Sequence, residues 1–491
     1  MADQNFKYKI RKKGITLTKY TGTETAVIIP AKIDGYPVKR IDGDAFEDCD
    51  SIKSVVIPDG VTRIEWGTFM GCKSLTSVVI PDSVKEIEGN AFDVCSSLIS
   101  VILPPNVTTI EGGLFAHCSS LTSVVIPEGV TKIEVSAFKN CISLTSVRIP
   151  ERVVKIDNCA FAGCSSLMSL NIPENVKAIG GQAFENCGSL TSLTIPDGVK
   201  WIGWCAFKGC TSLKSMSIPD GMTKIEWGTF EDCSSMTSVG LPDSVTEIGG
   251  HAFSGCSALP SIAIPRNVTK IGRNAFFNCN TLTSLDIPDG VEVIEWNTFR
   301  GCRSLTSLVI PPNVKKLGRH TFRDCDSLTS MVIPNGITEI EGNTFHGCRS
   351  LTSVTIPDGV TEIRRSAFYG CRSLTSVVLP KSLKKIGRGT FYGCQSLTFI
   401  DIPKSVTEIG RCAFACCRSL TSIVIPEGVT AIERKTFWGC NSLTSAVIPQ
   451  SVTRIEADSF ANCPDLTIRA PKGSKAEAYA KENHISFEEV L

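Results

Sequence analysis

Cysteine is the residue type in this chain with the widest choice of chemistry, since a thiol can ligate a metal, form a disulfide or act as a nucleophile. The 491-residue sequence has 23 cysteines, and 19 of them recur every 23 residues from Cys49 to Cys463. The other four are Cys159, Cys205, Cys412 and Cys416. A phenylalanine keeps the same period, from Phe46 to Phe460, three residues before each recurring cysteine. We therefore interpret the recurring thiols as small buried apolar side chains, mainly reduced, as in a reducing compartment.

The sequence predicts neither a metal site nor a catalytic site. Cys412, Cys416 and Cys417 form the densest group of thiols, but a zinc site would need a fourth ligand and a different spacing. The histidines, which lie in no nucleophile motif, are His117, His251, His320, His346 and His484. Paired glycines such as Gly112 and Gly113 fit turns rather than a phosphate-binding loop. We expect no enzymatic activity, no cofactor and no metal.

Tryptophan and arginine gather in one column when the chain is read in its 23-residue frame. Proline recurs from Pro58 to Pro449 without insertion or deletion, and we count it as position 1 of each repeat. Position 9 carries a large side chain in ten repeats and is mostly glycine in the others; the ten are Trp66, Trp204, Trp227, Trp296, Arg273, Arg319, Arg365, Arg388, Arg411 and Arg434. Stacked strands bring equal positions to about 5 Å, and Trp and Arg are enriched in binding hot spots. We predict a partner-binding stripe; a solvated loop column that tolerates any residue is the alternative.

Charge is distributed unevenly along a chain whose formal net charge is only +1. Residues 1–265 have a net charge of −5, residues 266–440 of +8 and residues 441–491 of −2. The middle block predicts an acidic protein or an anionic glycan as partner. Nucleic acid is disfavoured, because no groove-reading helix or aromatic RNA platform is evident. No run of 18 apolar residues exists, so we expect no membrane-spanning helix.

Positions 20 and 22 form two further columns that we expect to be exposed. Position 20 is serine in 17 of 18 repeats, Phe399 being the exception. We interpret these hydroxyls as partners of neighbouring backbone groups; an array that binds ice or a polysaccharide is disfavoured, because position 22 is irregular. Position 22 is aliphatic in the repeats of Val56, Val79, Ile102 and Val125. Such a row indicates either a partner site or ordinary strand propensity.

The repeat determines the elements that must position these columns. In Pro58–Ile80 the recurring apolar positions are 4, 7, 12, 15, 18, 21 and 23. Alternation around position 22 predicts a strand, Val61–Ile64 predicts a second short extended piece, and Thr68–Cys72 predicts a single helical turn. One repeat buries too little apolar surface to fold alone, so the repeats must stack.

Three parts of the chain follow from this pattern. Residues 1–26 predict an N-terminal β-hairpin cap. Residues 27–471 predict a solenoid of about 19 units, since stacked repeats share one continuous core. Residues 472–491 predict a C-terminal cap made of a helix and a strand.

The repeat also resembles a known family. Leu75–Ile80 resembles the L-x-x-L-x-L core of leucine-rich repeats. The form IPxxVxxIxxxAFxxCxSLTSV is similar to the BspA-like (Treponema pallidum-type) leucine-rich repeat family over about residues 27–471. The resemblance implies an α/β solenoid: a right-handed, curved superhelix with a parallel β-sheet on the concave side and short strands or single helical turns elsewhere. It also implies recognition of proteins or surfaces, as in adhesins and host-interaction proteins, and it brings no catalytic motif.

We therefore expect a non-catalytic recognition scaffold that binds a protein partner through the concave sheet or the Trp/Arg stripe. A surface adhesin for an anionic glycan and a structural spacer are the alternatives. The many reduced thiols and the lack of an apolar leader in residues 1–18 favour a cytoplasmic location. The family resemblance implies a secreted or cell-surface location instead.

Overall fold

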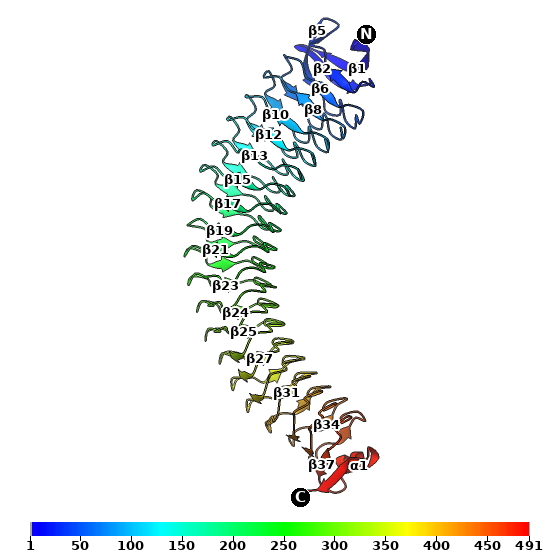
Figure 1. Ribbon diagram of the computed structural model, residues 1–491, viewed down its shortest axis with the longest axis vertical. Coiled ribbons are helices and arrows are strands. Elements are labelled where there is room, and N and C mark those ends of the chain that lie inside the picture. Colours follow the sequence, from blue (N-terminus) through cyan, green and yellow to red (C-terminus); the bar gives the residue numbers. More distant parts are fainter. Residues whose placement is uncertain (1, 491) are drawn as a thin grey trace. The chain divides into compact units, whose positions relative to one another are not determined.

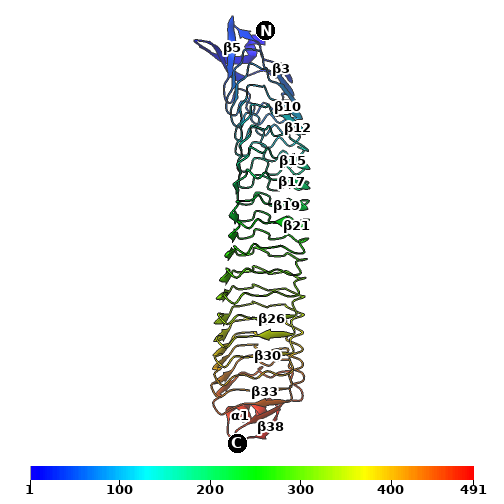
Figure 2. The same ribbon diagram turned by 90° about the vertical axis from the view of Figure 1, so that its left-hand side faces the viewer.

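The computed structural model describes residues 2–490 and divides into two units, Met1–Ser244 and Val245–Leu491, called unit 1 and unit 2 below. In each unit the 23-residue repeats follow one another as stacked coils (Figures 1 and 2). The chain is a parallel β-solenoid with few helices, as predicted. Among the described residues, no helix is long and apolar enough to cross a membrane.

One side of most coils in unit 1 is a short strand at positions 20 to 22. These strands are β3 (Ala26–Ile28), β6 (Ser54–Val56), β8 (Ser77–Val79), β10 (Ser100–Ile102), β12 (Ser123–Val125), β15 (Ser169–Asn171), β17 (Ser192–Thr194), β19 (Ser215–Ser217) and β21 (Ser238–Gly240). Where neighbours pair, they are parallel and offset by one repeat, as in Val101↔Val124. The middle side chain points inward while its two neighbours face outward, because successive side chains of a strand alternate.

A second side of each coil in unit 1 is a strand that ends at position 7. These strands are β5 (Tyr36–Ile41), β7 (Arg63–Ile64), β9 (Glu86–Ile87), β11 (Thr109–Ile110), β13 (Lys132–Ile133), β14 (Lys155–Ile156), β16 (Ala178–Ile179), β18 (Trp201–Ile202) and β20 (Lys224–Ile225). The isoleucine at position 7 is buried throughout. The polar residue at position 6 points outward, so this strand presents a second exposed column.

Unit 2 repeats both sides. Its strands at positions 6 and 7 are β22 (Glu247–Ile248), β23 (Lys270–Ile271), β24 (Val293–Ile294), β25 (Lys316–Leu317), β27 (Glu339–Ile340), β29 (Glu362–Ile363), β31 (Lys385–Ile386), β32 (Glu408–Ile409), β34 (Ala431–Ile432) and β36 (Arg454–Ile455). Its strands at positions 20 to 22 are β26 (Ser330–Val332), β28 (Ser353–Thr355), β30 (Ser376–Val378), β33 (Ser422–Val424) and β35 (Ser445–Val447), continued by β37 (Thr467–Ala470) and β38 (Ser486–Glu489).

Positions 9 to 15 differ from the single helical turn that the apolar spacing predicts. Residues with a left-handed backbone recur at positions 10 and 14, such as Gly67 with φ 67° and Gly71 with φ 75°. As a result Gly67 and Phe69 donate their N–H groups to the carbonyls of Gly89 and Ala91 in the next repeat, at 3.1 and 2.8 Å. A helix would direct these donors along its own segment, whereas here they join neighbouring coils.

The phenylalanine and cysteine columns fill the core of both units, which confirms the prediction made from their spacing. In unit 1 the phenylalanine rings of successive repeats stack with centroids 5.0 to 5.7 Å apart. Each recurring thiol from Cys72 onward is buried. Cys164, for example, donates from Sγ to the carbonyl of Phe138 at 3.1 Å. Burial raises the pKa of Cys164 to about 12, so this thiol stays protonated at neutral pH.

Both ends of the chain carry elements outside the repeat pattern. At the start, η1 (Ala2–Asn5) leads into β1 (Phe6–Arg11) and β2 (Gly14–Tyr20), which form an antiparallel hairpin, while β4 (Lys32–Ile33) pairs with β5. The Tyr20 ring stacks on Phe46 at 5.3 Å. At the other end α1 (Lys475–Glu482) places Tyr479 against Phe460, with ring centroids 6.0 Å apart. An aromatic ring from outside the repeats thus covers each end of the phenylalanine column.

Candidate functional site

The backbone fixes most of the position-9 column, because carbonyls of this column accept hydrogen bonds from the preceding repeat. Ser366 N donates to Arg388 O at 2.9 Å, and Gly389 N donates to Arg411 O at 2.9 Å. The phenylalanine rings of these repeats step by 5.4 Å. The side chains of the column project outward, and every predicted stripe residue is exposed.

The four tryptophans of the predicted stripe do not gather at one place. Trp66 lies six repeats before Trp204 in unit 1, Trp227 follows Trp204 directly, and Trp296 belongs to unit 2. Their exposed fractions run from 37% to 52%. The Trp204 ring lies beside Gly181, where an added Cβ would come within 2.7 Å of Nε1. These rings lie partly over glycines of neighbouring repeats, so the tryptophans are separate exposed rings rather than one aromatic surface.

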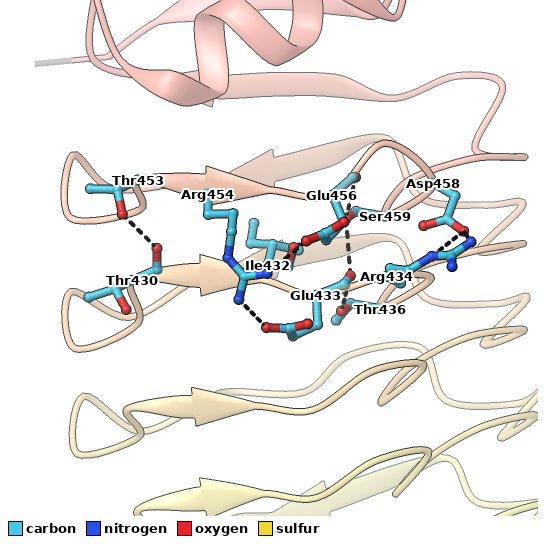
Figure 3. Close-up of polar contacts among 10 residues, drawn as sticks. All are labelled: Thr430, Ile432, Glu433, Arg434, Thr436, Thr453, Arg454, Glu456, Asp458 and Ser459. Atoms are coloured by element: carbon cyan, nitrogen blue, oxygen red, sulfur yellow. Dashed lines mark hydrogen bonds and ion pairs between the residues drawn. The ribbon is translucent and has the colours of Figure 1, made fainter.

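Two of the six arginines in the predicted stripe are paired with acidic groups. Arg319 Nε lies 3.3 Å from Glu341 Oε2, and its guanidinium lies 5.9 Å from the centroid of the Trp296 ring. Arg434 Nη2 lies 3.1 Å from Asp458 Oδ2 (Figure 3). That hydrogen bond raises the pKa of Arg434 and lowers the pKa of Asp458. These partners neutralise the charge of both guanidinium groups.

Arg365, Arg388 and Arg411 are different, since their side chains make no ion pair or hydrogen bond within residues 2–490. They belong to three consecutive repeats of unit 2. Each presents five N–H donors in a rigid fork that matches a carboxylate, phosphate or sulfate. We call these three residues the arginine triad.

Position 8 explains why the triad is unpaired. Glu341, the partner of Arg319, occupies position 8 of the next repeat, and the corresponding residues for Arg365 and Arg388 are Gly387 and Gly410. An added Cβ at Gly387 would lie 2.7 Å from Arg365 N, and one at Gly410 would lie 2.6 Å from Arg388 N. Only glycine fits against the backbone at this distance, so no carboxylate is supplied.

The corresponding residue for Arg411 is an acid that is already engaged. Glu433 at position 8 of the next repeat forms an ion pair with Arg454, which also contacts Glu456 Oε1 at 2.7 Å (Figure 3). The pair is anchored on β34 and β36, whose residues Ala431↔Arg454 are in register. Arg454 therefore takes up the acid that could have neutralised Arg411.

A groove of about 770 Å³ follows the triad along the surface of unit 2. Its charged lining consists of Arg319, Arg364, Arg365, Lys385, Arg388, Arg411, Glu362, Glu408 and Glu433. Arg364 is held by Glu339 at 2.7 Å, and Lys385 by Glu408 at 3.0 Å. Cationic groups outnumber carboxylates by six to three, so the groove favours an anionic occupant.

Arg364 and Lys385 belong to this groove although the position-9 pattern did not indicate them. Arg364 occupies position 8, which is Glu or Gly in most other repeats. Lys385 occupies position 6, where the residue type varies between repeats. A comparison of position 8 between repeats would have identified this groove. In unit 2, Arg364, Gly387 and Gly410 form the stretch of three consecutive repeats without an acid at position 8.

Three stacked rings occupy position 13 of consecutive repeats, four residues after position 9. His346, Tyr369 and Tyr392 stack with centroids 4.7 and 4.6 Å apart. Tyr369 and Tyr392 line a second hollow of about 440 Å³ together with Arg365 and Arg388. The rings cover one another's faces. This row therefore supports the groove wall and presents ring edges, rather than ring faces on which a ligand could stack.

The structure also locates the possible metal ligands, the four thiols outside the repeat pattern, the aliphatic column and the hydroxyl column. Among the described residues, no group of three or more His, Cys, Asp or Glu side chains could hold a metal ion. Cys159, Cys205, Cys412 and Cys416 all take a left-handed backbone, with φ of 53° to 60°. The position-22 aliphatics are exposed, from 37% at Val56 to 79% at Val378, except the half-buried Val447. The prediction that the position-20 serines bond neighbouring backbone is wrong for the described residues; threonines of position 19 do so, as Thr352 Oγ1 donates to Thr329 O at 3.0 Å.

Comparison with known proteins agrees with this architecture. A family model described as the BspA type leucine rich repeat region, with six copies, matches residues 39–165, 131–260, 246–375 and 361–480. No curated protein matches the chain.

Several solved structures are similar to the chain. A leucine-rich repeat protein from Bacteroides ovatus is 25% identical over 99% of this chain and 98% of its own, with a TM-score of 0.45. A leucine-rich cell surface protein from Faecalibacterium prausnitzii is 28% identical over 100% and 98%, with a TM-score of 0.33. The T. pallidum leucine-rich repeat protein is 27% identical over 52% and 89%, with a TM-score of 0.20.

Proposed function

Because the chain belongs to the BspA type leucine-rich repeat family, we propose that it is a non-catalytic binding scaffold whose arginine groove holds an acidic segment of a protein partner. Proteins built from such repeats are generally interaction or adhesin scaffolds. Members are typically cell-surface proteins, so the predicted cytoplasmic location is not supported.

One observation carries the proposal: three consecutive repeats expose guanidinium groups that no carboxylate of the described chain neutralises. Arg319, Arg364 and Arg434, which lie near the triad in the same unit, each have an acidic partner. A carboxylate-rich segment laid along the groove would supply one forked partner per repeat. In an extended segment every second side chain shares one face at a spacing of about 6.5–7 Å, near the 5.4 Å step between the repeats of the triad.

An anionic glycan remains the second candidate, because its charges also repeat at regular intervals along a chain. The two candidates separate by salt dependence and by affinity. Sulfate groups held mainly by charge lose affinity steeply as salt rises. A protein segment that adds backbone or apolar contacts to these ion pairs would lose less affinity.

The test is a binding measurement with two probes, a fluorescent octaglutamate peptide and a heparin octasaccharide. Both are titrated with the full chain and with the triple variant R365Q/R388Q/R411Q. A matched control, R303Q/R372Q/R418Q, removes three exposed arginines of position 16 in the same unit. We expect the triad variant to bind octaglutamate at least about tenfold more weakly, a change of about 1.4 kcal/mol, and the control variant to bind as wild type.

Equal losses in both variants would show a general charge effect and remove the groove from the proposal. Tighter binding of heparin than of octaglutamate, lost in the triad variant alone, would favour the glycan. Circular dichroism of each variant checks that the repeats remain folded.

A further inference from the structure

Unit 1 carries at position 8 the opposite charge to the groove of unit 2. Six consecutive repeats have an acid there: Asp42, Glu65, Glu88, Glu111, Glu134 and Asp157. Residues 82–134 include seven acidic and two basic residues, whereas residues 351–400 include seven basic and two acidic ones. Position 8 is thus acidic over six consecutive repeats of unit 1 and carries no acid over the three consecutive repeats of Arg364, Gly387 and Gly410 in unit 2.

Two neighbouring acids of this column are not neutralised by a cation. Glu88 is paired with Arg63, and Asp157 with Lys155 at 2.7 Å. Glu111 and Glu134, in between, make no ion pair within residues 2–490. Both are half-buried. Burial, and next the charges of Glu134 and Glu88, raise the pKa of Glu111, while the charge of Lys132 lowers it by less.

From these two surfaces we propose that the acidic segment in the arginine groove is a second copy of this chain, with Glu111 and Glu134 of one copy paired to Arg365 and Arg388 of the other. This inference rests on the proposed function and names its partner. The long exposed guanidinium groups can reach the recessed carboxylates. Gly112 at position 9 beside Glu111 presents no side chain that would block the approach.

The matching period favours a second copy over an unrelated acidic protein. The phenylalanine rings step by 5.6 Å between the repeats of Glu111 and Glu134. They step by 5.4 Å between the repeats of Arg365 and Arg388. Because one fold sets both spacings, two neighbouring guanidiniums meet two neighbouring carboxylates without distortion.

The experiment uses sedimentation velocity of the full chain from 1 to about 100 μM at low salt, where surface charges act most strongly. Two charge-reversal variants are compared, E111R/E134R and R365E/R388E. Position 8 accepts arginine, as Arg364 shows in a native repeat, and position 9 is exposed. We expect wild type to self-associate and each variant alone to be at least about tenfold weaker.

Mixing the two variants gives the decisive result. The mixture pairs reversed acids with reversed arginines, and native acids with native arginines, so it should regain the association that neither variant shows alone. A mixture that stays dissociated, or wild type that remains monomeric up to about 100 μM, would overturn the inference. The isosteric pair E111Q/E134Q, which should also weaken self-association, covers the case in which E111R/E134R fails to fold.

Octaglutamate binding separates this inference from the function on which it rests. Wild type that is monomeric but binds the peptide through the triad keeps the proposed function and removes the second copy. A variant R365E/R388E that still binds the peptide removes both.

Discussion

At the residue scale, the neighbouring repeat decides whether an arginine of position 9 can bind a partner. Arg319 and Arg365 are the same residue at the same position, yet Glu341 neutralises the first and Gly387 leaves the second unpaired. Converting Glu341 to Gln should release Arg319 into the groove and also remove a carboxylate 3.7 Å from Arg364. Since exposed ion pairs contribute about 0–1 kcal/mol, we expect E341Q to bind octaglutamate about two- to fivefold more tightly. Unchanged affinity would show that Arg319 does not reach the bound peptide.

His320, also a groove residue, predicts a pH dependence of stability. Burial, and next the charges of Arg323 and Arg300, lower the pKa of His320 to about 4. An unfolded histidine takes up its proton near pH 6.5, so between about pH 4 and 6.5 the unfolded chain binds more protons than the folded one. Stability due to this residue is therefore complete above pH 6.5 and falls as the pH drops through that window.

The variant H320N isolates this contribution, because asparagine occupies the same left-handed position in the neighbouring repeats at Asn297 and Asn343. Thermal unfolding at pH 5.0 and 7.5 measures it. We expect the loss of stability between the two pH values to be smaller in H320N than in wild type. An identical loss in both proteins would assign the pH dependence to other groups.

At the element scale, the turn from position 9 to 15 depends on two left-handed residues. Val94 occupies one of these positions with φ 59°, a conformation that costs a β-branched residue about 1–2 kcal/mol. Val94→Gly should therefore raise the free energy of unfolding by about 1 kcal/mol, measured by urea denaturation. The reverse change Gly370→Val, at φ 71° with no atom closer than 4.0 Å to the added Cβ, should lower it. A stabilised G370V would contradict the conformational argument.

The same turn shows how far the sequence could predict this structure. The strict spacing of phenylalanine and cysteine predicts the stacked core, because only a coil of constant length repeats one buried position for 19 turns. The turn itself was harder to predict, since apolar residues three apart fit a helical turn as well as the left-handed alternation. Position 14 is mostly glycine, asparagine or aspartate, the types that favour a left-handed backbone, whereas position 10 also carries residues such as Cys205 and His320 that do not identify the turn as clearly.

The candidate site was predictable only in part, for a related reason. The position-9 pattern identified the exposed arginines, but whether each arginine is paired depends on position 8 of the following repeat. Tryptophan and arginine were predicted as one stripe, whereas the structure gives separated tryptophans and a group of three unpaired arginines in unit 2. Such pairing is a contact between repeats, and reading one position at a time does not show it.

At the scale of the whole molecule, repeats contact mainly their neighbours, so stability should behave as a sum of repeat and interface contributions. Deleting Pro173–Ile195 removes one complete repeat of unit 1. The new neighbours would place Phe161 on Phe207 and Cys164 beside Cys210, restoring both buried columns. We expect this 23-residue deletion to fold with an unchanged circular dichroism signal per residue and a single unfolding transition.

The matched control is a shorter deletion, Pro173–Phe184, which removes about half of one coil. It takes away the buried Val176, Ile179 and Phe184 and leaves Phe161 and Phe207 separated by a coil without its ring. Loss of a single buried phenylalanine costs about 3–5 kcal/mol, and the strands on both sides would also lose their hydrogen-bonded neighbours. The smaller deletion should therefore be the more destabilising one in thermal unfolding. If the half-repeat deletion proved the more stable of the two, the repeats would not be the units that carry stability in this protein.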